Sequence, residues 1–227
     1  MDWALAIRRN RDQLKAIVLT LFALARMRTG GSLFTLPRCT FAIIMAILRP
    51  AESAVRRLIL IAAHRVVICP RPARTFVILG HRPGDPVSAM PSGMIPTRAF
   101  HLFDPLKSFD PEAIWDVEPK WESGFDLAPG YTSTLAAPDT PIDAVHLGQR
   151  LNAILRALDN LPHQARRLAR WQIKRDAALK ARKPTRMSPM RPGLPPGWRE
   201  RKIHEIDDVL RECHGLAGDL LNSPDTS

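Results

Sequence analysis

The chain has 227 residues and a formal net charge of +11; 45% of its residues are hydrophobic but only 6% are aromatic. This length is enough for one large domain or two small ones, with a core built mainly from Leu, Ile, Val and Ala. The cysteines, Cys39, Cys69 and Cys213, are far apart and odd in number. This spacing argues against a disulfide framework and favours a reducing compartment.

Residues 1–69 predict an N-terminal helical unit of two or three helices. Apolar residues recur at helical spacing from Ile7 to Ala25, and glycines follow at positions 30 and 31. We expect Pro50 to interrupt or restart the next helix. The apolar run 16–25 follows a basic stretch, as in a secretion signal. Because Arg26 comes directly after it, we favour a core helix or a helix on a membrane surface, and the run is too short to span a bilayer.

Residues 70–140 contain 11 of the 21 prolines. Because proline disrupts helices, we expect an extended or partly disordered segment that wraps around the helices. Short strands are predicted at Thr75–Leu79 and Phe100–Phe103. The segment is acidic overall, and we interpret Asp104 and the acidic residues after it as a solvated loop that neutralises basic helices.

Residues 141–183 predict a long capped helix. The sequence from Thr140 to Asp143 has the form of a capping box with proline at the first helical position. The apolar spacing keeps its register across Pro162, which indicates one kinked helix or two helices that share a packing surface. This seam consists of Leu147, Leu151, Ile154, Leu158, Leu161, Ala165 and Leu168, and it stops near Leu168.

A basic, proline-rich linker follows at residues 184–201, and a C-terminal amphipathic helix and tail at 202–227. The last helix could fold back on the long helix as a hairpin. The predicted fold class is therefore mainly α, either a helical bundle or a long helical hairpin, with a long, irregular, proline-rich middle segment. The N-terminal and C-terminal helices could then share one core.

Positive charge is densest between residues 163 and 202, a range that contains 13 Lys/Arg and only two acidic residues. On a helix these cations would cover about half of the circumference at ~100° per residue, with Trp171 inside the basic arc. Arginines beside an exposed indole suit phosphate contacts and base stacking. The candidate anion-binding residues are Arg166, Arg167, Arg170, Trp171, Lys174, Arg175, Lys180, Arg182 and Lys183. The alternative interpretation is a solvated helix, or one paired with the acidic segments.

No pattern for catalysis, metal binding or cofactor binding is present in the sequence. The Gly/Pro-rich stretch 80–86 lacks the phosphate-loop pattern, and the acidic residues lack calcium-loop spacing. Cys213 and His214 are neighbours, and we expect a packed cysteine and a surface histidine rather than a nucleophile pair. We therefore predict a non-enzyme without cofactors.

Several stretches resemble a group of bacterial proteins of unknown role. The resemblance lies in the basic helix and in 187–189 (MSP), 191–199 (RPGLPPGWR), 213–217 (CHGLA) and 224–227 (PDTS), and it is loose across residues 70–140. It implies a bacterial origin and transfers no catalytic residue and no activity.

Three functional hypotheses follow. The first is a non-catalytic, cytoplasmic protein that binds an anionic polymer, most simply nucleic acid, through the basic arc. The second is a peripheral protein on the cytoplasmic face of the inner membrane, anchored by N-terminal amphipathic helices. The third is a helical adaptor or self-associating structural protein, because helical seams permit a homo-oligomer as readily as an internal hairpin.

Overall fold

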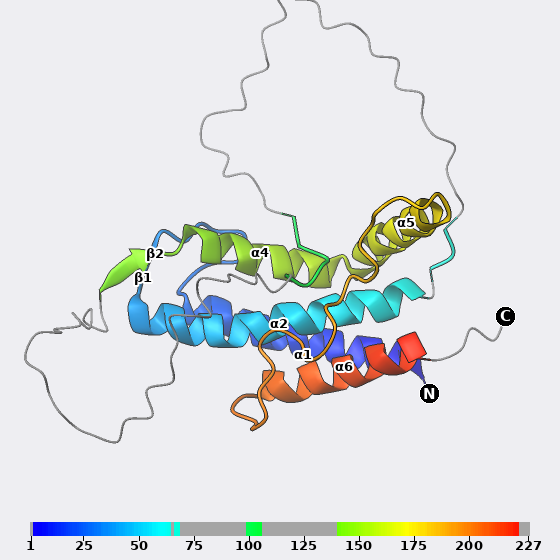
Figure 1. Ribbon diagram of the computed structural model, residues 1–227. Coiled ribbons are helices and arrows are strands. Elements are labelled where there is room, and N and C mark those ends of the chain that lie inside the picture. Colours follow the sequence, from blue (N-terminus) through cyan, green and yellow to red (C-terminus); the bar gives the residue numbers. More distant parts are fainter. Residues whose placement is uncertain (1, 65, 69–98, 106–139, 223–227) are drawn as a thin grey trace, which may run out of the picture.

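The computed structural model describes residues 2–64, 66–68, 99–105 and 140–222 (Figure 1). This part of the chain is mainly helical, as predicted. Its helices are α1 (Trp3–Leu24), α2 (Arg38–His64), α4 (Val145–Asp159), α5 (Leu161–Lys180) and α6 (Glu205–Asn222), and its strands are β1 (Thr35–Pro37) and β2 (Pro141–Asp143). The predicted strand at Thr75–Leu79 lies outside the described residues.

Helix α2 lies at the centre of the bundle and packs against α1, α4, α5 and α6 (Figure 1). Its C-terminal half is buried on nearly every side, including the whole stretch from Ser53 to Ile61. A helix that is apolar around most of its circumference is stable only when other elements surround it. The N-terminal and C-terminal helices therefore share one core, as the sequence suggested.

Helix α6 runs antiparallel to α1 and packs against α1 and α2 (Figure 1). Arg9 of α1 pairs with Glu212 of α6. The apolar side of α6, which includes Ile206, Leu210 and Cys213, is buried. A hairpin between α6 and the long basic helix is therefore not what the chain forms, because the larger apolar surface of α2 takes the place of that partner.

Two helices, α4 and α5, replace the single long helix at the break around Asn160. Asn160 leaves helical geometry with φ −114° and ψ 43°, and Pro162 lies in the first turn of α5, where its missing N–H costs no helical hydrogen bond. Leu147, Leu151 and Leu158 of α4 are buried, as are Leu161 and Leu168 of α5. The seam is thus a packing surface shared by two helices, and it ends near Leu168 as predicted.

The predicted capping box at residues 140–143 is wrong. Residues 141–143 form β2, which pairs antiparallel with β1 so that Leu36 lies opposite Ile142. Helix α4 begins only at Val145, whose N–H donates to the Asp143 carboxylate at 2.9 Å. Proline fixes φ at a value that suits a short edge strand as well as a helical first turn, so the local pattern did not distinguish the two.

Helix α2 passes through Pro50 without interruption, contrary to expectation. Proline has no N–H to donate to the carbonyl four residues earlier, which here belongs to Ala46. The Arg199 guanidinium donates to that carbonyl at 2.7 Å instead. A side chain from the 184–201 linker therefore supplies the hydrogen bond that the helix lacks.

Residues 99–105 form no strand, so the predicted strand at Phe100–Phe103 is wrong. Their backbone groups bond to side chains and to the linker: the His101 carbonyl accepts from Arg56 at 3.1 Å, and the Asp104 N–H donates to the Pro189 carbonyl at 2.9 Å. Phe100 and Leu102 are buried. This segment packs on the helices, as a wrapping segment should.

Candidate functional site

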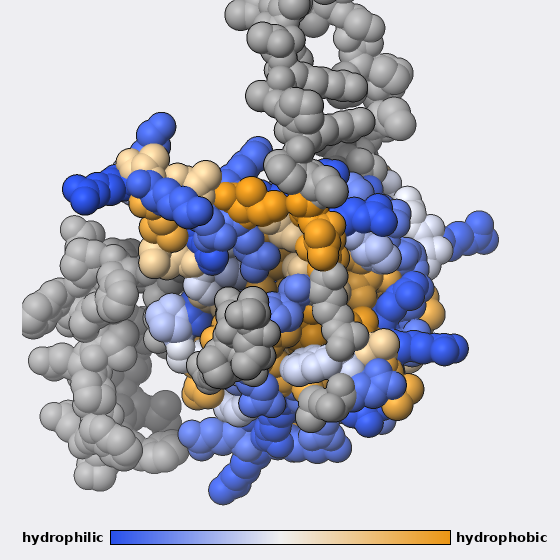
Figure 2. All heavy atoms as spheres, turned by 90° about the vertical axis from the view of Figure 1, so that its right-hand side faces the viewer, coloured by the Kyte–Doolittle hydropathy of each residue, from blue (hydrophilic) through white to orange (hydrophobic). Residues whose placement is uncertain are grey.

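The predicted anion-binding residues lie on α5 and on the turn that follows it. Only the N-terminal half of α5 contributes to the core, through Leu161, Ala165, Leu168 and Ala169. Beyond these residues the helix projects away from the α1–α2–α6 layer (Figure 1). Seen from the right of that view, hydrophilic side chains project from the upper edge of the molecule at the height of α5, with apolar residues between them (Figure 2).

Three of the nine candidates are used within the fold. The Arg167 guanidinium donates to the Phe100 carbonyl at 2.9 Å. The Arg175 guanidinium donates to the Asp176 carboxylate at 2.7 Å and to the Met187 carbonyl at 2.9 Å. These arginines hold residues 99–105 and the start of the linker against α5. They therefore contribute to the fold whether or not a ligand is bound.

Trp171 is the third, and the prediction of an exposed indole is wrong. The ring is half-buried and meets the Phe103 ring edge-on, with centroids 4.9 Å apart. The Arg175 guanidinium lies 5.5 Å from the centre of the indole. Because residues 99–105 and Arg175 already contact the ring, the indole is not a free platform for stacking on a base.

The other six candidates are exposed and pair with no acidic side chain within the described ranges. Successive cations at positions 166, 170 and 174 lie on one side of α5, because residues four apart are neighbours on a helix. The remaining three surround the end of the helix. These six residues, which we call the α5 cationic face, are Arg166, Arg170, Lys174, Lys180, Arg182 and Lys183.

The end of α5 is a Schellman turn. The Lys183 N–H donates to the Ala178 carbonyl and the Arg182 N–H to the Leu179 carbonyl, both at 2.9 Å. Arg182 therefore takes the left-handed conformation, with φ 52°, at a position that glycine usually fills. The turn stops the helix and leaves both cations in solvent.

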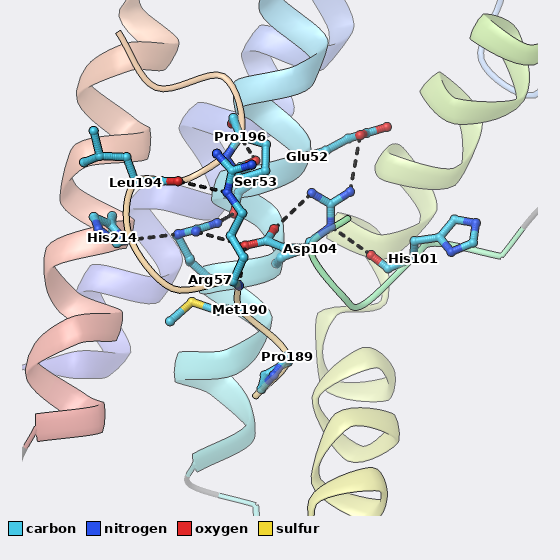
Figure 3. A network of polar contacts seen from close by, with 12 residues as sticks. Glu52, Ser53, Arg57, His101, Asp104, Pro189, Met190, Leu194, Pro196 and His214 are labelled. Carbon is cyan, nitrogen blue, oxygen red and sulfur yellow. Dashed lines mark hydrogen bonds and ion pairs between the residues drawn. The ribbon is translucent and has the colours of Figure 1, made fainter. Parts of the chain in front are cut away.

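A second polar cluster lies inside the bundle, where sequence reasoning placed nothing (Figure 3). Arg57 of α2 and Asp104 are completely shielded from solvent, and their guanidinium and carboxylate approach to 3.1 Å. Arg56 reaches the other carboxylate oxygen at 3.4 Å. The expectation of a solvated acidic loop is therefore wrong for Asp104, since its carboxylate compensates two arginines of α2.

The linker closes the cluster from the other side (Figure 3). Arg186 donates to the Asp104 carbonyl at 2.8 Å, and the Arg191 N–H lies 3.4 Å from the Asp104 carboxylate. Ser53 of α2 donates its hydroxyl to the Pro196 carbonyl at 2.7 Å. The cluster thus joins three segments that are distant in sequence.

Glu52 extends the cluster toward α4. Arg150 of α4 binds its carboxylate in a bidentate manner, with nitrogen–oxygen distances of 2.8 and 3.0 Å, and Arg56 contacts it at 3.4 Å. With the pairs described above, Glu52 and Asp104 face Arg56, Arg57 and Arg150. Each carboxylate is thus held by two guanidinium groups, an arrangement that fixes segments rather than freeing an acid or base for catalysis.

Cys213 and His214 do not form a nucleophile pair. Cys213 is completely buried, and burial raises the pKa of its thiol to about 12, so the thiolate needed for reaction is absent at neutral pH. His214 is half-buried rather than on the surface. Its Nδ1 accepts a hydrogen bond from Arg57 at 3.3 Å, and burial together with the Arg57 charge lowers its pKa.

One feature of the sequence indicates the buried cluster. Arg56 and Arg57 stand inside the apolar run of α2, between Val55 and Leu58, and charges in such a run are rarely left without a partner. Their partner could not be chosen from sequence, because Asp104 is one of nine acidic residues in the range 70–140.

Across the described residues, no three His, Cys, Asp or Glu side chains come together as metal ligands, and none of the helices found there has the length and apolar character of a membrane span. No family model matches the chain, and no match was found among curated proteins or solved structures.

Proposed function

We propose that this protein binds nucleic acid through the α5 cationic face, without catalysis. The observation that carries the proposal is a run of six exposed Lys and Arg side chains with no acidic partner in the described part of the chain. Binding of such cations to a polyanion is favourable, because it releases the counterions condensed on the polyanion. Because the helix projects from the core, a phosphate backbone can approach it without steric conflict from the α1–α2–α6 layer.

The geometry favours backbone contacts over base readout. Trp171 is packed against Phe103 and Arg175, so it cannot stack on a base unless it leaves its site. Phosphate contacts orient a nucleic acid but do not distinguish sequences. We therefore expect similar affinity for duplexes of different sequence and no strong preference for single strands.

The test is a triple variant, Arg166→Gln/Arg170→Gln/Lys174→Gln. Arg167 is left intact because it bonds to the Phe100 carbonyl and its loss would disturb the fold. We expect weaker binding to every duplex, and a slope of log K against log salt that is reduced by up to about 3, since each phosphate contact contributes about 0.9. Fluorescence anisotropy with labelled duplexes at several salt concentrations measures both quantities.

A matched control removes the same charge elsewhere. Arg8, Arg28 and Arg201 are exposed cations on α1, on the turn after α1 and on the linker. Their combined replacement by glutamine lowers the net charge by the same three units but leaves the α5 cationic face intact. If the control lost as much affinity as the α5 variant, overall charge rather than this face would explain binding. Unchanged affinity in the α5 variant would overturn the proposal.

Membrane association stays the alternative prediction, and one observation supports it. Ile173 and Leu179 are exposed on the projecting half of α5, at 44% and 39%, so apolar side chains stand among the cations as in an interfacial helix. The predicted anchors, the N-terminal helices α1 and α2, instead bury apolar residues in the core, among them Leu14 and Val18 of α1 and Leu48 of α2. Flotation of the full chain with anionic and neutral vesicles tests this alternative. Flotation that persists after nuclease and is lost in Ile173→Ser/Leu179→Ser would favour the membrane.

A further inference from the structure

A cleft on the outer side of α2, distinct from the α5 cationic face, has no assigned role. It has a volume of about 730 Å³, which lies within the range of small-molecule sites. Its floor is one side of the first turns of α2, where Phe41, Ala42, Met45 and Ala46 follow at helical spacing. Ile142 of β2 and the linker residues Gly197, Trp198 and Arg199 form the walls.

The walls are held firmly in place. Gly197 has φ 82°, and its Cα lies so close to α2 that an added Cβ would be 2.7 Å from the Pro50 nitrogen. Arg199 is bonded to the Ala46 carbonyl at 2.7 Å and lies 3.5 Å from the buried Asp207 carboxylate. Trp198 meets the His214 ring edge-on at 5.7 Å. The wall therefore exists before any ligand binds, so little ordering is needed on binding.

The charge of the cleft is of one sign. Arg38, Arg49 and Arg199 line it together with apolar and aromatic residues, and no acidic residue is among the lining side chains. Arg38 and Arg49 are exposed and pair with no carboxylate in the described ranges. They are eleven residues apart on α2, about 16 Å along the axis at ~1.5 Å per residue. The floor of the cleft thus has an exposed arginine near each end, with apolar and aromatic residues and the Arg199 guanidinium between them.

We propose that this cleft binds a small organic anion with a planar aromatic body and a phosphate, sulfonate or carboxylate group. The aromatic body packs on Met45 and Ala46 beside the Trp198 and Phe41 rings. The anionic group accepts hydrogen bonds from Arg38 or Arg49, whose planar guanidinium matches such a group in a bidentate manner. The proposal is independent of nucleic-acid binding, because no residue of α5 lines the cleft.

Calorimetric titration of the full chain with 1-naphthyl phosphate tests the proposal. Two reference compounds separate the two parts of the ligand: 1-naphthol has the ring without the charge, and inorganic phosphate has the charge without the ring. We expect 1-naphthyl phosphate to bind at least about tenfold more tightly than either, since the apolar and charged contacts act together. Binding no tighter than that of inorganic phosphate would overturn the proposal.

Variants then locate the site. We expect the double variant Arg38→Gln/Arg49→Gln to weaken binding at least about fivefold, because it removes both arginines that could hold the anionic group. The substitution Ala42→Phe fills the exposed floor of the cleft without removing charge and should abolish binding. The matched control is Arg28→Gln, an exposed arginine outside the cleft, and the α5 triple variant should bind 1-naphthyl phosphate like the wild type. Circular dichroism and thermal unfolding confirm that each variant is folded.

The opposite pattern of results would assign binding elsewhere. If Ala42→Phe bound as well as the wild type, or if the α5 triple variant lost binding, the ligand would not lie in this cleft. Equal affinity for a short polyglutamate peptide and for 1-naphthyl phosphate would show a general cationic surface instead of a site for an aromatic anion.

Discussion

Asp104 and Arg57 form an ion pair at 3.1 Å in which neither side chain has any exposed surface. Burial lowers the pKa of Arg57, and the Asp104 charge acts in the opposite direction. Taking both charges out of water costs free energy, which the attraction between them and additional hydrogen bonds must offset. Because the pair holds residues 99–105 on α2, the free energy of docking this segment includes the cost of desolvating both charges.

We expect Asp104→Asn to lower the free energy of unfolding by about 3–5 kcal/mol, because it leaves the buried Arg57 without a compensating charge and Arg56 with Glu52 alone. The double variant Arg57→Met/Asp104→Leu should lose less than the single variant, since both members of the fully buried pair are then apolar and Arg56 keeps its pair with Glu52. Urea unfolding followed by circular dichroism measures both. As a surface control, Asp176→Asn removes the half-exposed partner of Arg175 and should change stability by no more than about 1 kcal/mol. Equal losses in the single and double variants would contradict this account.

The bond from Arg199 to the Ala46 carbonyl replaces the one that Pro50 cannot make. We expect Arg199→Met to cost about 1–3 kcal/mol, because a charged donor is lost and the carbonyl is left without a partner. In a Pro50→Ala background the helix regains its own N–H donor, so the same substitution should cost less. A double-mutant cycle by denaturant unfolding gives the difference, and additive costs would show that the two residues are not coupled in this way.

Gly193 and Gly197 of the linker allow the cost of a left-handed backbone conformation to be measured separately from the cost of close packing against α2. Gly193 has φ 79° with nothing within 4 Å of an added Cβ, whereas Gly197 has φ 82° with the Pro50 nitrogen at 2.7 Å. We expect Gly193→Ala to cost about 1–2 kcal/mol, the conformational penalty of a left-handed residue. Gly197→Ala should cost at least ~1 kcal/mol more, because the methyl group must displace the linker from α2. Thermal unfolding compares the two variants, and equal costs would indicate that the linker yields freely.

Arg182 occupies a left-handed position at the end of α5 with φ 52°. Because glycine adopts this conformation without strain, Arg182→Gly should raise the free energy of unfolding by about 1 kcal/mol. The control, Arg182→Ala, removes the same charge but keeps the Cβ, and should give little stabilisation. Denaturant unfolding distinguishes strain from charge, since only the former separates the two variants.

We expect the lowered pKa of His214 to reduce the stability of the folded protein at mildly acidic pH. It faces Arg57 from α2 and, farther away, Asp104, and its pKa is lowered in the folded protein. Below its ordinary pKa of 6.5, the unfolded chain binds a proton that the folded chain excludes, so stability falls as pH decreases through this range. We expect the free energy of unfolding to decrease less between pH 7 and 5 in His214→Asn than in the wild type. A difference of the opposite sign would contradict the lowered pKa.

The order and type of the helices could be predicted from sequence, because periodicity is a local property of the chain. The spacing of Leu147, Leu151 and Ile154 requires an apolar partner surface, and all three are buried. The basic character of α5 is likewise a property of composition. The break at Asn160 was only one of two alternatives, since a proline in a first turn and a proline in a kink look alike in sequence.

Contacts between distant segments were decided only by the tertiary structure. Asp104 meets Arg57 and the linker because packing of residues 99–105 on α2 places them together, and no local pattern marks that register. The same packing leaves Trp171 half-buried by placing Phe103 against it. Pro50 stays helical because Arg199, 153 residues away from Ala46, donates to the Ala46 carbonyl in place of the N–H that Pro50 lacks. Sequence determines which faces must be buried, whereas the choice of partner depends on the free energy of the whole packed arrangement.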